Sequence, residues 1–184
     1  EHDACGVAFV VDMHGRATHE MVQRGLKCLF QLDHRGATGA EENVGDGAGI
    51  LLQIPDSFFR DVVDFDLPEL GHYAAGMAFL PSESPDHAVE AIEALAEQEG
   101  LKVIGWREVP TNQMVVGEIA GRTLPHIEQV FVRPAEGVTL NEKELNTKTF
   151  IARKIAEHKV YATKMSQASY FYLPSLSTRT LIYK

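Results

Sequence analysis

A cysteine close to the start of the sequence has the most readily interpreted chemistry. Cys5 is followed by Gly6 and by an apolar run that ends at Val11. If residues 1–4 were removed, Cys5 would carry a thiol and a free α-amine. That amine titrates at about 7.7–8.0, so it can act as the thiol's general base at neutral pH. While Ala4 is attached, the same nitrogen is an amide without basicity. The position predicts either an N-terminal nucleophile or an ordinary buried cysteine, because free Cys is commonly buried.

Two glycine-containing segments follow further along the chain, Leu32-Asp-His-Arg-Gly36 and Gly45-Asp-Gly-Ala-Gly49. Five glycines lie among residues 35–49, which predicts a loop with positive φ angles or with closely approaching backbone. Asp46 is a single carboxylate, and the loop lacks the Lys and Ser/Thr of a phosphate-binding loop. We therefore expect a turn or a domain contact at Asp46, and no metal site.

Composition narrows the classes of protein to which the sequence can belong. The 184 residues suffice for one domain with a real core, and 45% of them are hydrophobic. The formal net charge of −9, without a basic stripe, argues against nucleic-acid binding. No apolar run approaches the ~20 residues that span a bilayer, and no signal peptide is evident. We therefore expect no membrane partner. The two cysteines lie at positions that suggest neither a disulfide framework nor a zinc site, which favours a reducing, cytoplasmic setting.

Hydrophobic periodicity predicts mixed helices and strands in the first half of the chain. A helix ending near His34 would bury a stripe from Met21 to Phe30, and Cys28 beside that stripe is interpreted as core packing. Strands are expected at Cys5–Val11, 50–54 and 73–80, a turn at Asp12–Gly15, and a second helix at 55–63.

The second half continues the same alternation of elements. Ser84 and Pro85 predict the start of a helix that ends at Gly100. Thr139 with Glu142 predicts a capping box for a helix running to about His158. Strands are expected at residues 101–108, 127–132, 170–173 and 180–183. The fold class is α+β with mostly antiparallel strands.

Four segments, taken together and in order, resemble one known family. They are Asp3–Asp12, Leu32–Ala37, Gly45–Gly49 and Phe171–Lys184, and the resemblance is to the start of glutamate synthase large chains. It implies the front part of a class-II glutamine amidotransferase domain, a member of the N-terminal nucleophile (Ntn) hydrolases. The implied architecture is a four-layer αββα sandwich, incomplete at its C-terminal end. Residues 1–184 would form a single domain in which residues 1–4 are propeptide-like.

The resemblance also implies a reaction and roles for particular residues. Cys5 matches the nucleophile that hydrolyses glutamine to glutamate and ammonia through a thioester, with the ammonia passed to 2-oxoglutarate elsewhere in the full enzyme. Arg35 and Gly36 match an Arg-Gly turn near the nucleophile, which implies substrate binding or shaping of the loop. The alternative for Arg35 is a solvated arginine that ends a helix, favoured by the helix dipole.

Cofactors and partners are implied in the same way. The resemblance places FMN and an iron-sulfur cluster in later domains and none in this segment. Implied partners are glutamine, the remaining domains of the same chain, and a small reductase subunit or ferredoxin. The family's oxyanion Asn-Gly pair and substrate clamp lie further downstream, so the segment alone is expected to be weakly active or inactive. An incomplete sandwich would leave unpaired strand edges, so the segment alone is also expected to self-associate or to rearrange its terminus. Two alternatives remain open, namely another class-II amidotransferase and a non-catalytic interaction domain of the same fold.

Overall fold

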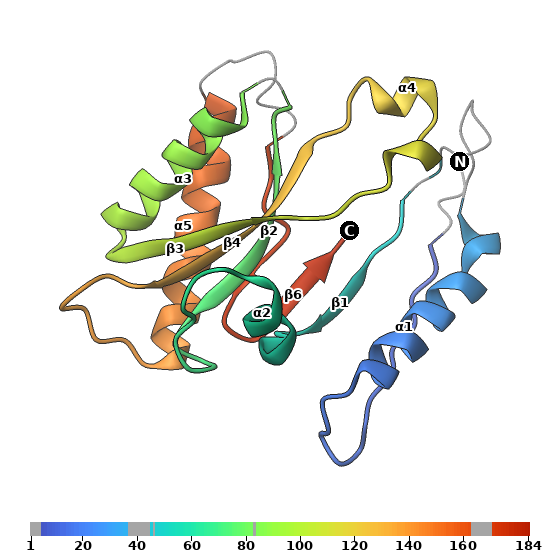
Figure 1. Ribbon diagram of the computed structural model, residues 1–184, viewed down its shortest axis with the longest axis horizontal. Helices are drawn as coiled ribbons and strands as arrows, with labels where there is room; N and C mark the ends of the chain where they lie inside the picture. Colours follow the sequence, from blue (N-terminus) through green and yellow to red (C-terminus); the bar gives the residue numbers. More distant parts are fainter. Residues whose placement is uncertain (1–4, 37–44, 46, 83, 163–170) are drawn as a thin grey trace. The chain divides into compact units, whose positions relative to one another are not determined.

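The computed structural model describes residues 5–36, 45, 47–82, 84–162 and 171–184 (Figure 1). The chain folds into two compact units. Unit 1 comprises Glu1–Leu52, Asn112–Thr123 and Tyr183–Lys184, and unit 2 comprises Gln53–Thr111 and Leu124–Ile182. The prediction of a single domain is not tested by this division and stays a prediction.

Unit 2 is built on a four-stranded antiparallel sheet with the order β3-β4-β2-β5. The strands are β2 (Ala74–Leu80), β3 (Leu101–Glu108), β4 (His126–Pro134) and β5 (Leu176–Ser177). The expected strands at 73–80, 101–108 and 127–132 are therefore confirmed to within a residue or two. Every residue of β2 is buried, as a central strand covered on both faces requires.

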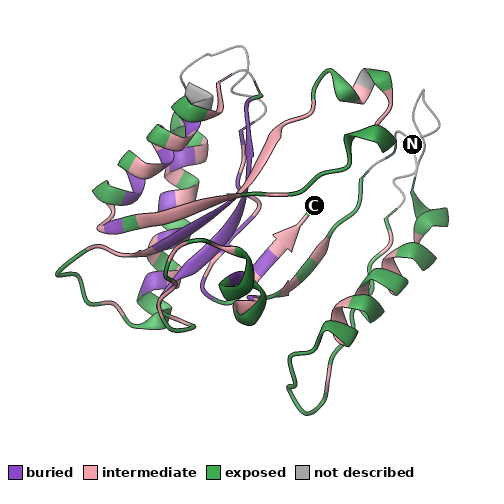
Figure 2. Cartoon of the chain, viewed as in Figure 1, coloured by how far each residue is buried: buried purple, intermediate pink, exposed green. Residues whose placement is uncertain are grey.

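Two long helices, α3 (Pro85–Gln98) and α5 (Glu142–Ala162), cover one face of this sheet (Figure 1). Pro85 occupies the first helical turn as predicted, although the Ser84 side chain makes no capping hydrogen bond. The buried face of α3 carries side chains at helical spacing: Ala88, Ile92, Leu95 and Ala96. These pack with Val130 and Val132 of β4 in the main hydrophobic core. Figure 2 shows the buried residues concentrated in the sheet and in the inward sides of the two helices.

The start of α5 differs from the prediction. The capping box is formed by Asn141 and Glu144, each donating its backbone N–H to the other's side-chain oxygen, at 2.9 and 3.0 Å. The Thr139–Glu142 box was wrong because Asn141 caps as well as Thr does and lies three residues before a glutamate of its own. The helix also continues past His158 to Ala162.

The opposite face of the sheet is covered by aromatic side chains from α2 (Asp56–Val62) and the loop after it. The Phe131 ring meets Phe59 and Phe65 edge-on, with ring centroids 4.9 and 5.3 Å apart. Gly105 lies beneath Phe65, since a methyl group built there would come within 2.3 Å of the ring. The alternation of Val130, Phe131 and Val132 between the two faces is what a strand covered on both sides demands.

The last strands of unit 2 depart from the sequence prediction. Tyr172 forms only a single bridge with Phe79, and Tyr170 lies outside the described residues. Pro174 has no N–H to continue the pairing. Pairing resumes at β5, which the sequence did not predict, and β6 (Thr180–Tyr183) follows as expected.

Unit 1 contains α1 (His19–Gln31), the 3₁₀ turn η1 (Asp33–Arg35), most of β1 (Ile50–Gln53), η2 (Gln113–Val115) and α4 (Glu118–Gly121). The first helix and the Asp12–Gly15 turn are confirmed, and the Gly15 N–H donates to the Asp12 carbonyl over 3.0 Å. The helix's apolar stripe is only half-buried or exposed, so the prediction that it is buried was wrong. Cys28 is likewise half-buried.

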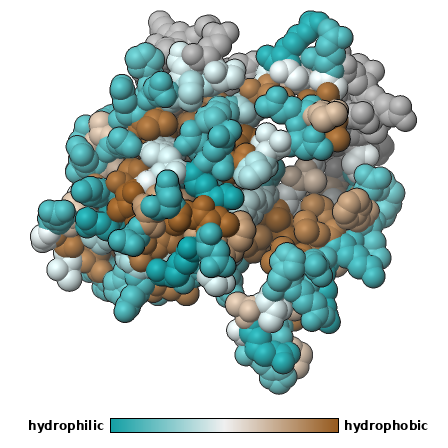
Figure 3. Space-filling view, in the orientation of Figure 1, coloured by the Kyte–Doolittle hydropathy of each residue, from teal (hydrophilic) through white to brown (hydrophobic). Residues whose placement is uncertain are grey.

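The N-terminal segment is the clearest correction. Cys5–Val11 is irregular rather than a strand, and Val7 and Phe9 are 87% and 89% exposed. A strand needs a pairing partner for its backbone, and the described residues supply none for this segment. On the face drawn in Figure 3, apolar side chains reach the surface among the polar ones.

Candidate functional site

The candidate nucleophile lies at the start of the described chain. Cys5 is exposed, and its thiol is not part of a disulfide. The following residue, Gly6, is half-buried. An exposed thiol fits a nucleophile better than the buried cysteine that was the alternative interpretation.

Gly6 brings the Cys5 segment against the end of the first helix. A methyl group built on Gly6 would lie 2.9 Å from Leu32 Cδ2 and 3.3 Å from both Cβ and Cγ of Arg35. A side chain at Gly6 would have to push aside Leu32 Cδ2 and the aliphatic stem of Arg35, so the backbone next to Cys5 packs closely on that stem. Two segments singled out in the sequence for their chemistry therefore meet within unit 1.

The 3₁₀ turn η1 fixes the position of Arg35. Its backbone N–H donates to the Leu32 carbonyl over 2.8 Å, and the Gly36 N–H donates to the Asp33 carbonyl over 3.0 Å. Gly36 itself has a φ of −86°, and a methyl group there would meet only the Asp33 carbonyl, at 3.5 Å. The described contacts thus give a reason for Arg35 at this place but no steric reason for glycine at position 36.

A second local structure holds the other end of the Cys5 segment. Asp12 Oδ2 accepts hydrogen bonds from Arg16 Nε and Nη2 at 3.1 and 2.9 Å, and Asp12 Oδ1 accepts from the His14 N–H at 2.7 Å. The Arg16 bonds, followed by the His14 bond, hold the pKa of the Asp12 carboxyl below its usual value. This turn fixes where the N-terminal segment reverses before α1.

The remaining candidates contribute no further site. Asp46 lies outside the described residues. Among the residues the structure does describe, no group of three or more His, Cys, Asp or Glu side chains could hold a metal ion. No helix in the described part of the chain combines the length and apolarity that crossing a membrane requires.

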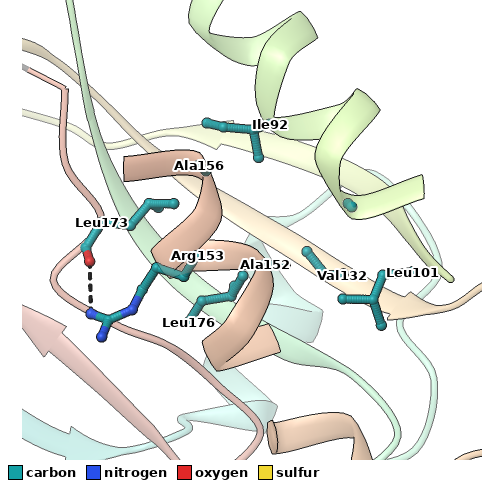
Figure 4. Close-up of a pocket in the computed structure, with 9 residues that line it drawn as sticks. Ile92, Leu101, Val132, Ala152, Arg153, Ala156, Leu173 and Leu176 are labelled. Atoms are coloured by element: carbon teal, nitrogen blue, oxygen red, sulfur yellow. Dashed lines mark hydrogen bonds between the residues drawn. The ribbon is translucent and has the colours of Figure 1, made fainter. Parts of the chain in front are cut away.

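Unit 2 contains a small cavity between α3, α5 and the sheet, which Figure 4 draws. Arg153 is the charged member among the described residues that line it, and its Nη1 donates to the Leu173 and Pro174 carbonyls at 2.9 and 2.6 Å. That guanidinium is committed to the backbone, and the other lining residues are apolar. The cavity therefore offers no recognition for the charged ends of an amino acid and is a feature of the core.

Comparison with known proteins decides the family. The family model of class-II glutamine amidotransferases matches residues 5–184. The chain belongs to the class-II glutamine amidotransferases. The mixed helices and antiparallel strands agree with the Ntn-hydrolase sandwich expected of this family, and unit 2 by itself provides one helical layer on one sheet. The match begins at Cys5, the residue that the chemistry of an N-terminal nucleophile singles out.

Similar proteins within the family are glutamate synthases. The chain is 40% identical over 187 residues to the glutamate synthase [NADPH] large chain of Bacillus subtilis (strain 168) and 40% identical over 191 residues to that of Azospirillum brasilense. It is 36% identical over 192 residues to ferredoxin-dependent glutamate synthase 2, chloroplastic, of Arabidopsis thaliana. All of the chain is covered in each case, but it spans only 11–12% of the length of these relatives.

Sequence reasoning missed two members of the amidotransferase's candidate site. Leu32 and Gly6 make the contact between the Cys5 segment and the helix end, yet the sequence singled out Gly6 only as a neighbour of Cys5. The available signal was a glycine directly after a candidate nucleophile, a position where close backbone approach is expected. Cys5, Arg35 and Gly36 have been placed, and their roles stay predictions.

Proposed function

We propose that this chain carries out the glutamine-hydrolysing step of a glutamate synthase, with Cys5 as the nucleophile. One observation carries the proposal: the family match begins at Cys5, the residue whose α-amine would become free if residues 1–4 were removed. The exposed thiol supports it as well.

The reaction follows from the two groups that a terminal Cys5 would carry. The free α-amine takes the thiol proton, and the thiolate attacks the side-chain amide carbon of glutamine. The carbon–nitrogen bond breaks, the proton goes to the leaving nitrogen, and ammonia departs from a thioester. Water, deprotonated by the same amine, attacks the thioester carbonyl and releases glutamate together with the Cys5 thiol.

Arg35 has a positioning role in this proposal. Its Cβ and Cγ lie 3.3 Å from where a side chain on Gly6 would begin, so Arg35 supports the backbone that presents Cys5. The atoms of Arg35 nearest to this position are Cβ and Cγ of the aliphatic stem, and the guanidinium would bind the substrate's carboxylate. The structure supports the positioning role of the stem more directly than the substrate-binding role of the charge.

The rest of the proposal concerns the complete protein. Ammonia would pass to 2-oxoglutarate, and electrons would come from a reductase subunit or ferredoxin; the names of the relatives specify NADPH for some of those proteins and ferredoxin for others. An iron-sulfur cluster would belong to other parts of the protein, because a cluster takes about four thiolate ligands and this chain has 2 cysteines. We assign FMN to other parts of the protein as well, as the family resemblance implies. We place the protein in the cytoplasm, where a reducing environment keeps the Cys5 thiol free.

This function is tested on the protein as its gene encodes it. The measurements are intact mass, N-terminal sequencing and a glutamine-dependent ammonia assay. We expect a chain that begins at Cys5 and releases ammonia from glutamine but not from asparagine. A chain that begins at Cys5 and releases no ammonia would contradict the proposal and favour a non-catalytic domain of the same fold. Release of ammonia by a chain that keeps residues 1–4 would contradict the role of the free amine.

A further inference from the structure

A glycine stands in the middle of the helix whose end contacts the Cys5 segment. Gly25 is an interior residue of α1 (His19–Gln31), although glycine is a poor helix former. The structure supplies a reason for it. A methyl group built on Gly25 would lie 2.9 Å from Ile50 Cδ1 and 3.9 Å from Ile50 Cγ1. The missing side chain lets α1 pack closely against the first residue of β1.

Ile50 is itself preceded by Gly49, whose close contacts are with backbone atoms rather than with a side-chain end. A methyl group on Gly49 would lie 2.7 Å from the Tyr183 carbonyl oxygen and 3.4 Å from Lys184 Cα. Backbone atoms cannot move aside as a side-chain end can, so glycine is required at position 49, just before β1, where the chain meets Tyr183 and Lys184. All of these residues belong to unit 1.

These contacts form a continuous series that ends at Cys5. Tyr183 meets Gly49, Ile50 meets Gly25, and α1 then runs about 10 Å to Leu32, at ~1.5 Å per residue. Leu32 and Arg35 in turn meet Gly6. A methyl group at Gly25 must displace either the end of the Ile50 side chain or the helix. Because a helix is stiff over two turns, any movement of α1 at Gly25 is carried to the helix end on which the Cys5 segment rests.

We propose that Gly25 is a positioning residue for the nucleophile, acting through the α1–β1 contact with Ile50. The proposal rests on the proposed function of Cys5 and adds a second place, remote from the thiol, where the geometry of the nucleophile is determined. Displacements of a few tenths of an ångström at a reacting group are enough to change rates, since about 1 Å can cost ~100-fold.

The test uses the complete gene product and a compensating pair of variants. Gly25→Ala adds the methyl group that meets Ile50 Cδ1, and Ile50→Val removes that same atom while leaving Cγ1 in ordinary contact. We expect Gly25→Ala to lower kcat for glutamine hydrolysis about 3- to 10-fold at little change in KM, and the double variant to recover most of the loss. The rate at which iodoacetamide labels Cys5, followed by peptide mass, should change and recover in parallel.

The matched control is Gln23→Ala, an exposed position on the same helix. It makes α1 a better helix, as Gly25→Ala does, without adding an atom near Ile50. The inference is wrong if Gly25→Ala has the same activity and Cys5 labelling rate as Gln23→Ala. It is also wrong if adding Ile50→Val to Gly25→Ala restores neither the activity nor, where folding is lost, the folding of the variant. If the wild-type protein releases no ammonia, the proposed function fails, and the Cys5 labelling rates still decide the positioning role.

Discussion

The two units of the chain differ in how deeply their side chains are buried and in which candidate site residues they contain. Unit 2 contains every buried residue found among the described residues, and its sheet is covered by helices on one face and by aromatic rings on the other. Unit 1 contains Cys5 and Arg35, and none of its described residues is buried. Its close contacts occur at glycines 6, 25 and 49.

This difference separates the source of stability from the location of the chemistry. Burial of large side chains accounts for most folding free energy, so unit 2 should determine how stable the protein is. The thiol of a nucleophile has to reach its substrate, and Cys5, the proposed nucleophile in unit 1, is exposed and lies next to a close backbone contact at Gly6. Substitutions in unit 1 should therefore change the rate of glutamine hydrolysis, and those in unit 2 should change the free energy of unfolding. Four substitutions test this difference.

The largest effect is expected at Cys5. Replacing the nucleophilic sulfur in Cys5→Ser should lower the glutaminase rate by about 10⁴–10⁶-fold, as loss of a nucleophile does in other enzymes. The melting temperature should stay within a degree or so of wild type, because the side chain is exposed. Ammonia release and a thermal melt measured on one preparation check both statements. A large fall in melting temperature would show that Cys5 is also structural.

In unit 2, Phe131→Ala should have the largest effect on stability. The Phe131 ring is fully buried and contacts Phe59, Phe65 and Tyr73. Removing it should lower the free energy of unfolding by about 3–5 kcal/mol, measured by urea denaturation. The rate at which Cys5 of the folded fraction reacts should not change. A proportional loss of Cys5 reactivity would mean that the units are not separate in their effects.

Asp56→Asn tests a polar contribution to unit 2. Asp56 Oδ1 accepts from the Tyr73 hydroxyl at 2.8 Å, and Asp56 Oδ2 accepts from Arg60 Nε at 2.9 Å. The hydrogen bonds from Arg60 and, to a smaller extent, from Tyr73 lower the pKa of the Asp56 carboxyl. Burial, and then the hydrogen bond to Asp56, raise the pKa of the Tyr73 hydroxyl. A carboxyl with a lowered folded pKa stabilises the protein above its unfolded pKa of about 3.9, and this stabilisation is lost as the pH falls through the folded value.

Asp56→Asn should therefore reduce the free energy of unfolding at pH 7 by about 1–2 kcal/mol. It should also reduce the dependence of stability on pH below about 4. Denaturation curves between pH 2 and about 7 check this, with Asp61→Asn as the control, because Asp61 is an exposed carboxyl on the same helix. Equal dependence of stability on pH in the two variants would show that the Asp56 carboxylate makes no special contribution to stability.

The smallest effect, and the most local, is expected from Gly6→Ala. The added methyl group must displace Leu32 Cδ2 and the Arg35 stem, so glutamine hydrolysis should slow about 3- to 10-fold. Unfolding free energy should change by less than about 0.5 kcal/mol, because no core residue of unit 2 is involved. Ala8→Gly, at an exposed position of the same segment, is the control. A stability loss without a rate change would place Gly6 in the folding of unit 1 alone.

The sequence predicts unit 2 far better than unit 1. The helix after Ser84 and the strands β2, β3 and β4 follow hydrophobic periodicity, which works where one face is buried against a neighbour. It failed at Cys5–Val11, where an apolar run suggested a covered strand and the structure pairs it with nothing among the described residues. It also missed β5, because two residues after Pro174 are too few to show a period.

For the candidate site, residue type was informative and geometry was not. The place of a cysteine near the start of the sequence, together with the family resemblance, made Cys5 a candidate, and the resemblance of the Arg-Gly text made Arg35 one. No local pattern reveals that Gly6 and Arg35 touch, since the contact joins two segments separated by a helix. Gly25 gave no signal beyond being an unfavourable residue inside a helical pattern.

The most direct test of the central claim, that Cys5 is the reactive group of unit 1, is covalent trapping. A protein that begins at Cys5 is treated with a glutamine analogue that carries a chloroketone in place of its side-chain amide, and the modified peptide is identified by mass spectrometry. We expect a single adduct on the peptide that starts with Cys5, formed more slowly when glutamine is added. An adduct on Cys28 instead, or an unmodified Cys5 in a folded protein, would contradict it.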